Sequence, residues 1–153
     1  MIRIALDTNI LAYLAGVSRA PEDDGKIERC RDLLERLGGR ASLFAPTQAL
    51  GELFVVLRRS GAPAAEARGI LLRFADTFGT PESGRSTLFA ASDLVVDHRL
   101  QFWDALILSA AADAGCALLL SEDMQDGFVA RGVTIANPLA RTLPASLGIL
   151  LRA

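Results

Sequence analysis

The sequence predicts an α/β fold in which a parallel β-sheet is covered by helices on both faces. Short, wholly apolar segments alternate with longer segments of helical periodicity, which is typical of such sheets. The 153 residues contain no internal repeat and no long linker, so we expect a single domain over residues 1–153. Hydrophobic residues make up 51% of the chain, as large buried faces require.

The first half of the chain is predicted to form two strands and three helices. In order, they cover residues 2–6 (strand), 10–14 (helix), 26–37 (helix), 42–45 (strand) and 46–60 (helix). Both strands are short apolar runs, as expected for strands buried on two faces. The second helix stops at Gly38, and Pro46 suits the first turn of the third helix.

The second half is predicted to form three helices and then two strands. In order, they cover residues 63–78 (helix), 91–99 (helix), 102–114 (helix), 117–120 (strand) and 133–136 (strand). Pro63 opens the first of these helices, and "GTPESGRS" after it is a loop. Four apolar residues of this helix leave core packing and a protein interface open as alternatives: Ile70, Leu71, Phe74 and Phe78.

Composition excludes several classes of protein. No apolar run reaches the roughly 18 to 20 residues that span a bilayer, and the N-terminus lacks the plan of a secretory signal. We therefore expect no membrane association and a cytoplasmic location. Cys30 and Cys116 lack metal-ligand spacing. The net charge of −2 argues against indiscriminate coating of nucleic acid, but it allows a nuclease whose metal ion meets the phosphate.

Acidic residues follow two of the predicted strands. In parallel sheets ligands bind beyond the carboxyl ends of the strands. Asp7 ends the first strand in "MIRIALDTNI", and Glu122 and Asp123 come directly after "ALLLS". Taken alone, "DTN" also fits a helix N-cap. Two strands that offer acids to the same edge favour a binding site.

Two further acids lie in apolar helical surroundings. Glu52 shares a face with polar residues opposite the apolar stripe of its helix, a pattern that leaves a solvated face and a cleft as alternatives. Asp104 shares a face with Ile107 and Leu108 in "FWDALILSAAADAG". An isolated buried carboxylate costs several kcal/mol unless it is compensated. Asp104 is therefore a candidate for a compensated, functional position.

Four carboxylates in one cleft predict a divalent cation, because they would otherwise repel one another. Ligation by oxygen alone favours Mg²⁺ or Mn²⁺ over zinc. Such an ion lowers the pKa of a bound water and neutralises charge on a leaving oxygen. Hydrolysis of a phosphodiester is the reaction class that follows. Arg59, on the same helix as Glu52, is a candidate contact for the phosphate backbone of such a substrate.

The acids lie in motifs that resemble those of PIN-domain ribonucleases, most closely the VapC-type toxins of toxin-antitoxin pairs. The motifs are "ALDTNIL", "GELFVVL", "FWDALILSAAADAGC", "LLLSEDMQDG" and "GVTIANP", in the family's order and spacing over residues 2–138. The resemblance implies a PIN-like three-layer α/β/α sandwich with a mainly parallel sheet of four to five strands. It also implies Mg²⁺ or Mn²⁺ as the cofactor.

The resemblance assigns roles to individual residues. The acidic quartet around the metal would be Asp7, Glu52, Asp104 and Asp123. Asn9 and Ser121 match positions that orient the acids or water. The fourth acid has three candidates, Glu122, Asp123 and Asp126, of which Asp123 is preferred.

The expected function is metal-dependent hydrolysis of RNA, as the toxin of a type II toxin-antitoxin system. A cognate antitoxin and a homodimer are the partners that the resemblance implies. The alternative within the family is an inactive PIN-like scaffold that binds RNA or protein. A receiver domain is disfavoured because the sole lysine, Lys26, precedes the second strand, and a haloacid-dehalogenase-like phosphatase because Asn9 replaces its second acid.

Overall fold

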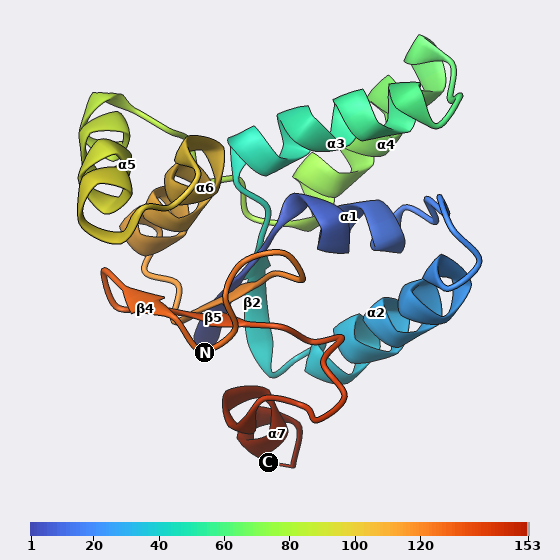
Figure 1. Ribbon diagram of the computed structural model, residues 1–153. Coiled ribbons are helices and arrows are strands. Elements are labelled where there is room, and N and C mark those ends of the chain that lie inside the picture. The colour runs from blue at the N-terminus through green and yellow to red at the C-terminus, as the bar shows by residue number, and fades with distance from the viewer. Residues whose placement is uncertain (153) are drawn as a thin grey trace.

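The computed structural model describes residues 1–152, which form a central sheet with helices packed around it (Figure 1). The strands are β1 (Ile2–Leu6), β2 (Ala41–Phe44), β3 (Leu118–Leu120), β4 (Val129–Ala130) and β5 (Val133–Ala136). The helices are α1 (Thr8–Leu14), α2 (Asp23–Leu37), α3 (Thr47–Arg59), α4 (Ala64–Thr77), α5 (Arg85–His98), α6 (Phe102–Asp113) and α7 (Ala145–Arg152).

The sheet has the strand order β2-β1-β3-β5-β4. All neighbouring strands are parallel except the edge strand β4, which runs antiparallel to β5. The predicted α/β sandwich with a mainly parallel sheet is confirmed. Leu6 pairs with Leu120, so β1 and β3 end at the same level. The chain leaves β1 toward β2 and later returns on the other side of β1 to form β3, which opens a crevice at these two strand ends.

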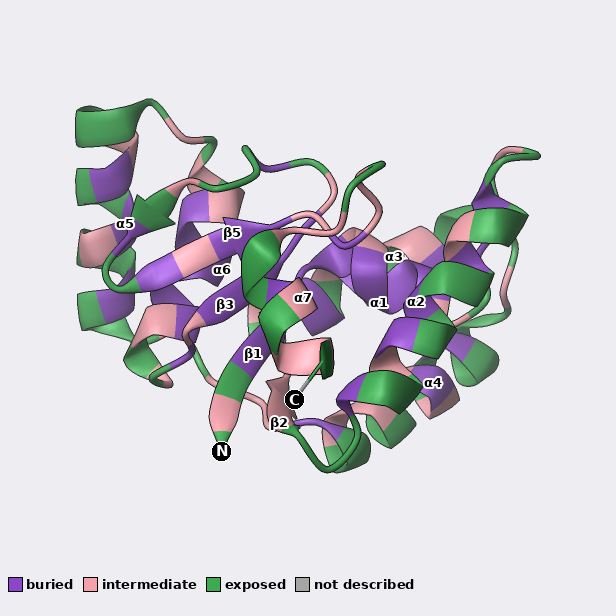
Figure 2. Cartoon of the chain, turned by 90° about the horizontal axis from the view of Figure 1, so that it is seen from below, coloured by how far each residue is buried: buried purple, intermediate pink, exposed green. Residues whose placement is uncertain are grey.

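Helices cover both faces of the sheet. Both views place α1 and α2 on one side and α5 and α6 on the other (Figures 1 and 2). The inner strands and the facing sides of these helices are buried (Figure 2), as the apolar strand sequences require. No helix within residues 1–152 combines the length and apolar character needed to cross a membrane.

Three helices begin earlier than their periodicity predicts, because polar side chains organise their first turns. The first helix begins at Thr8 since the Asp7 carboxylate accepts a hydrogen bond from the Thr8 amide. Asp23 accepts hydrogen bonds from two amides of the preceding loop, where α2 begins. The Thr87 hydroxyl accepts from the Gly84 amide, and α5 therefore begins at Arg85 rather than at residue 91.

Two elements carry no clear signal in the sequence. Strand β4 has only two residues, and it forms because the chain reverses at Arg131 and Gly132 to pair with β5. Helix α7 packs against α2, and its Leu147 is fully buried. The Arg40 guanidinium donates to the carbonyls of Leu150 and Leu151 at 3.2 Å and so holds the last turn of α7.

The junction between β2 and α3 is fixed by a close backbone contact. The Gly79 amide donates to the Leu43 carbonyl at 3.0 Å, and the Ala45 amide donates to the Gly79 carbonyl at 2.7 Å. A side chain at residue 79 would overlap the ring of Phe44. The absence of a side chain at Gly79 therefore allows the close contact that leads the chain into α3.

We expect Gly79→Ala to lower the free energy of unfolding by about 1 to 3 kcal/mol, because the added methyl overpacks the Phe44 ring. Chemical denaturation with urea measures the change. Gly25→Ala in α2 is the matched control, since no atom lies within 4 Å of the added carbon there. Equal stability of the two variants would contradict the packing argument.

Candidate active site

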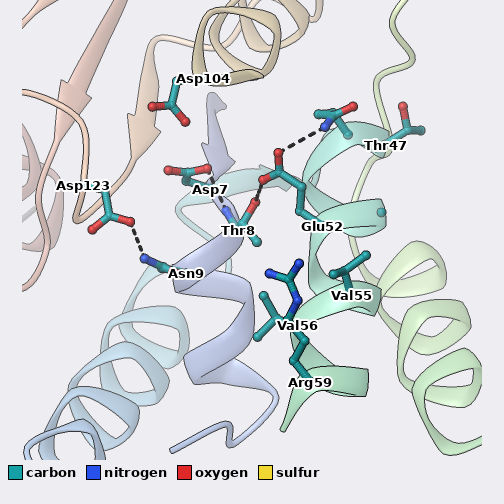
Figure 3. A pocket seen from close by; sticks show the side chains of 12 residues that line it. Asp7, Thr8, Asn9, Thr47, Glu52, Val55, Val56, Arg59, Asp104 and Asp123 are labelled. Carbon is teal, nitrogen blue, oxygen red and sulfur yellow. Dashed lines mark hydrogen bonds between the residues drawn. The ribbon is translucent and has the colours of Figure 1, made fainter. Parts of the chain in front are cut away.

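A cavity of about 570 Å³ lies at the carboxyl ends of β1 and β3 (Figure 3). Its lining includes all four predicted acids, Asp7, Glu52, Asp104 and Asp123. They come from the end of β1, from α3, from the first turn of α6 and from the loop after β3. The fold therefore brings together acids that lie far apart in the sequence, from Asp7 to Asp123.

Asp7 is the most enclosed of these acids, with only 6% of its surface exposed. Its carboxylate accepts hydrogen bonds from the Thr8 amide at 2.8 Å and from the Ser121 hydroxyl at 2.7 Å. Burial raises the pKa of Asp7, the two hydrogen bonds lower it, and the charges of Asp104 and Glu52 raise it, so that the pKa is about 6. Asp7 thus caps α1 and is also a buried carboxylate close to two other acids.

Glu52 is oriented by neutral donors on both carboxylate oxygens. The Thr8 hydroxyl donates to one oxygen at 2.6 Å, and the Gln48 amide donates to the other at 3.1 Å (Figure 3). The opposite face of α3 is buried in the core through Leu50, Leu53 and Leu57. The core-facing stripe predicted for this helix is confirmed, and the Glu52 face borders the cavity.

Asp104 lies in the first turn of α6, where the Gln101 side chain caps its amide at 3.0 Å. The carboxylate itself accepts no hydrogen bond within residues 1–152. Burial raises the pKa of Asp104, and the nearby charges of Glu52 and Asp123 add to the effect. Residues 105–111 of the same helix are all buried, so the position is as apolar as the sequence indicates.

The three acids after β3 have different environments. Asp123 lines the cavity and accepts a hydrogen bond from the Asn9 amide (Figure 3). Glu122 turns away from the cavity, where it accepts from the Tyr13 hydroxyl at 2.9 Å and pairs with Lys26 at 3.1 Å. Asp126 accepts from the backbone amide of Asn137 at 2.9 Å. Of the three candidates, only Asp123 borders the cavity.

The negative charge of the cavity has no paired cation. None of the four acids forms an ion pair within residues 1–152, where the salt bridges involve other carboxylates. Arg59 is the one basic side chain in the lining. Its guanidinium extends back along α3 toward the acids (Figure 3). The site therefore holds excess negative charge within reach of solvent.

The donor set fits a hard divalent cation. Within the described part of the chain, no three acidic, histidine or cysteine side chains lie close enough together to hold a metal ion by themselves. Mg²⁺ does not require one, because it is typically held by one or two carboxylates together with water and substrate phosphate. The raised pKa values of Asp7 and Asp104 show carboxylates whose charge lacks a compensating partner. A divalent cation would supply that compensation.

Several residues of the cavity were not among the predicted site residues. Thr8, Gln48, Thr47 and Gly51 line the cavity, and the first two bind Glu52. The signal for Gln48 was its spacing of four residues from Glu52, which places both side chains on one face. Thr8 could be found only by recognising Asp7 as the helix cap, because the cap directs the first turn toward the cleft.

The chain resembles known proteins over most of its length. The PIN domain family model matches residues 4–128, and no curated protein sequence gives a match. The chain is similar in fold to VapC20 of Mycobacterium tuberculosis, described as a toxin that cleaves the sarcin-ricin loop. The identity is 20%, the TM-score is 0.58, and 78% of this chain and 89% of that chain are covered.

Two further solved structures share the fold. VapBC2 from Rickettsia felis, bound to a promoter DNA fragment, has 17% identity and a TM-score of 0.61, with 80% of this chain and 89% of that chain covered. A toxin-antitoxin complex from Klebsiella pneumoniae has 20% identity and a TM-score of 0.61, with 88% and 97% covered. Since the family model covers most of the length, including all four positions of the predicted acids, the chain belongs to the PIN domain family.

Proposed function

We propose that the chain is a metal-dependent endoribonuclease that hydrolyses RNA phosphodiester bonds with Mg²⁺ or Mn²⁺. The observation that carries the proposal is the convergence of four carboxylates, from four separate segments, in one cavity without an ion pair. Membership of the PIN domain family supports the nuclease activity. The acids are proposed as the metal-binding and catalytic set.

The acids and Arg59 would have different roles in the reaction. Asp7 and Asp104 would be the most direct ligands of the cation, which when bound would activate water and neutralise charge on the departing oxygen. Glu52 and Asp123 would accept protons or hold water, since hydrogen bonds from Thr8 and Gln48 orient Glu52 and one from Asn9 orients Asp123. Arg59 would bind a neighbouring phosphate of the RNA.

Neutral residues would keep the acids in place without cancelling their charge. The Ser121 hydroxyl donates to Asp7 and accepts from the Met124 amide at 3.1 Å, so its direction is fixed. Asn9 holds Asp123 in the same manner from α1. Such outer partners typically affect metal affinity or activity by 10–100-fold when they are removed.

We further propose that the protein is the toxin of a toxin-antitoxin pair, that an antitoxin binds it, and that it forms a homodimer. The toxin and the antitoxin follow from the fold shared with VapC20, VapBC2 and the Klebsiella complex. The homodimer is supported by Phe89 and Val96, which share one face of α5 and are 57% and 80% exposed.

The decisive test replaces the central acids. We expect Asp7→Asn and Asp104→Asn to reduce cleavage of single-stranded RNA at least about a hundredfold, because a ligand matters no less than its outer partners. EDTA should abolish cleavage by the unmodified chain, and added Mn²⁺ should restore it. Cleavage that survives EDTA and both substitutions would refute the proposal.

A second test separates the acids that follow β3. We expect Asp123→Asn to weaken Mn²⁺ binding about tenfold or more in calorimetric titrations, since the ligand set loses a charge. Asp126→Asn is the matched control, because its side chain oxygen can still accept from the Asn137 amide outside the cavity. The assignment of Asp123 is wrong if the two variants bind Mn²⁺ equally well.

The raised pKa of Asp7 predicts a pH-dependent stability in the absence of metal. Because the pKa is about 6 in the folded chain and 3.8 otherwise, the folded state binds more protons between these values, and stability falls as the pH rises through them. A difference of about two units corresponds to about 3 kcal/mol.

Asp7→Asn should therefore stabilise the metal-free protein above about pH 6 and have little effect below about pH 4. Urea denaturation in EDTA at both ends of this range measures the difference. A loss of stability in Asp7→Asn at neutral pH would show that its two hydrogen bonds outweigh the buried charge.

A further inference from the structure

One face of α3 forms a wall of the cavity, and a glycine lies in the middle of that wall. The residues of this face lining the cavity are Thr47, Gln48, Gly51, Glu52, Val55, Val56 and Arg59. Gly51 is exposed and precedes the acid Glu52 directly. The bare helix backbone is therefore accessible from the cavity beside a proposed catalytic group.

Nothing within the chain requires glycine at this position. No atom outside the adjacent backbone lies within 4 Å of the place where a side chain would begin, and the backbone has no positive φ angle. Glycine inside a helix is less stable than alanine, because it loses more conformational freedom on folding. The empty space above Gly51 is thus unused by the folded chain and belongs to the cavity.

Gly51, Val55 and Arg59 form a line along α3, since they are spaced four residues apart. Gly51 and Arg59 are eight residues apart, or about 12 Å along the helix axis. Val55 lies between them and is 45% exposed. This line of residues begins beside the acids, passes the apolar side chain of Val55 and ends at Arg59, the one basic side chain of the cavity lining.

We propose that Gly51 is a substrate-positioning residue, at which the sugar-phosphate backbone of single-stranded RNA lies directly against α3. The inference rests on the proposed ribonuclease function and adds the path of the strand. Glycine allows a ligand to approach the helix backbone closely. From this contact the strand continues along Val55 to Arg59, which binds the next phosphate, while the scissile bond faces Glu52 and the other acids.

The proposal separates substrate binding from metal binding. A methyl group at residue 51 would occupy space above the helix, but it would contact no carboxylate and no side chain that holds one. It would also favour the helix. Substitution at Gly51 should therefore impair RNA binding in a protein that is more stable and binds metal normally, which a structural role could not produce.

The test uses Gly51→Ala and Gly51→Leu in the full chain, with Gly69→Ala in α4 as the matched control. Gly69 also lies inside a helix with no atom within 4 Å of the added carbon, and it is not part of the cavity lining. Three properties are measured: the thermal midpoint, the affinity for Mn²⁺ by calorimetry, and KM and kcat on a short fluorescent single-stranded RNA.

We expect both alanine variants to raise the thermal midpoint by about 2 to 4 °C and to bind Mn²⁺ as the unmodified chain does. Gly51→Ala should raise KM about tenfold, which is the effect expected when one substrate contact is lost. Gly51→Leu should raise KM further. Gly69→Ala should leave KM unchanged.

Three results would overturn the inference about Gly51 without affecting the proposed function. They are an unchanged KM in Gly51→Ala, an equal rise of KM in Gly69→Ala, and weaker Mn²⁺ binding by the Gly51 variants. An unmodified chain that binds Mn²⁺ but does not cleave RNA would overturn the proposed function, and the inference with it. The two failures are therefore distinguishable in the same set of measurements.

Discussion

The buried carboxylate of Asp7 is the constraint on which the site depends. It ends β1, caps α1 and accepts a hydrogen bond from Ser121 at the end of β3. Three elements therefore meet at one anion that is 6% exposed and lies near two other acids. The sheet can hold this charge because the neighbouring strands fix the backbone on both sides, and the crevice at their ends leaves room for a cation.

The partners of the acids distinguish the site from the rest of the molecule. Outside the cavity, two of the less exposed carboxylates are paired with basic side chains: Glu122 pairs with Lys26 and Asp113 with Arg131. Inside it, the donors are neutral hydroxyl and amide groups, which fix direction without removing charge. These donors are Thr8, Asn9, Gln48 and Ser121. Such a division is what a cation site needs, because a basic partner within the chain would compete with the ion for each carboxylate.

The sequence predicted the sheet and the placement of three acids because each depended on a regular period or a strand end. Asp7 follows an apolar strand, and Glu52 and Asp104 lie on helices whose faces can be counted. Asp123 was preferred after β3 on the family resemblance, and it does line the cavity. No period could predict which of the three acids borders the cavity, since residues 121–128 form a loop. It depends on tertiary partners: the pairing of Glu122 with Lys26 leaves Asp123 to face Asn9. Helix α7 was missed for a related reason, because its stability comes from packing on α2.

The largely apolar sequence of α3 did not show whether the face that carries Glu52 is exposed to solvent or lines a cleft. One face packs in the core and the other lines the cavity, so neither needs the charged surface that usually marks an exposed helix. Two features of the cavity oppose stability, the buried charge of Asp7 and a glycine inside α3. Natural sequences depart from locally favourable choices mainly at functional or strained sites. Helices α2 and α4 also contain glycines that lie outside this cavity, Gly25 and Gly69, so a glycine alone does not mark the site. The buried charge of Asp7 is the departure that indicates selection for binding at this edge of the sheet, independently of family membership.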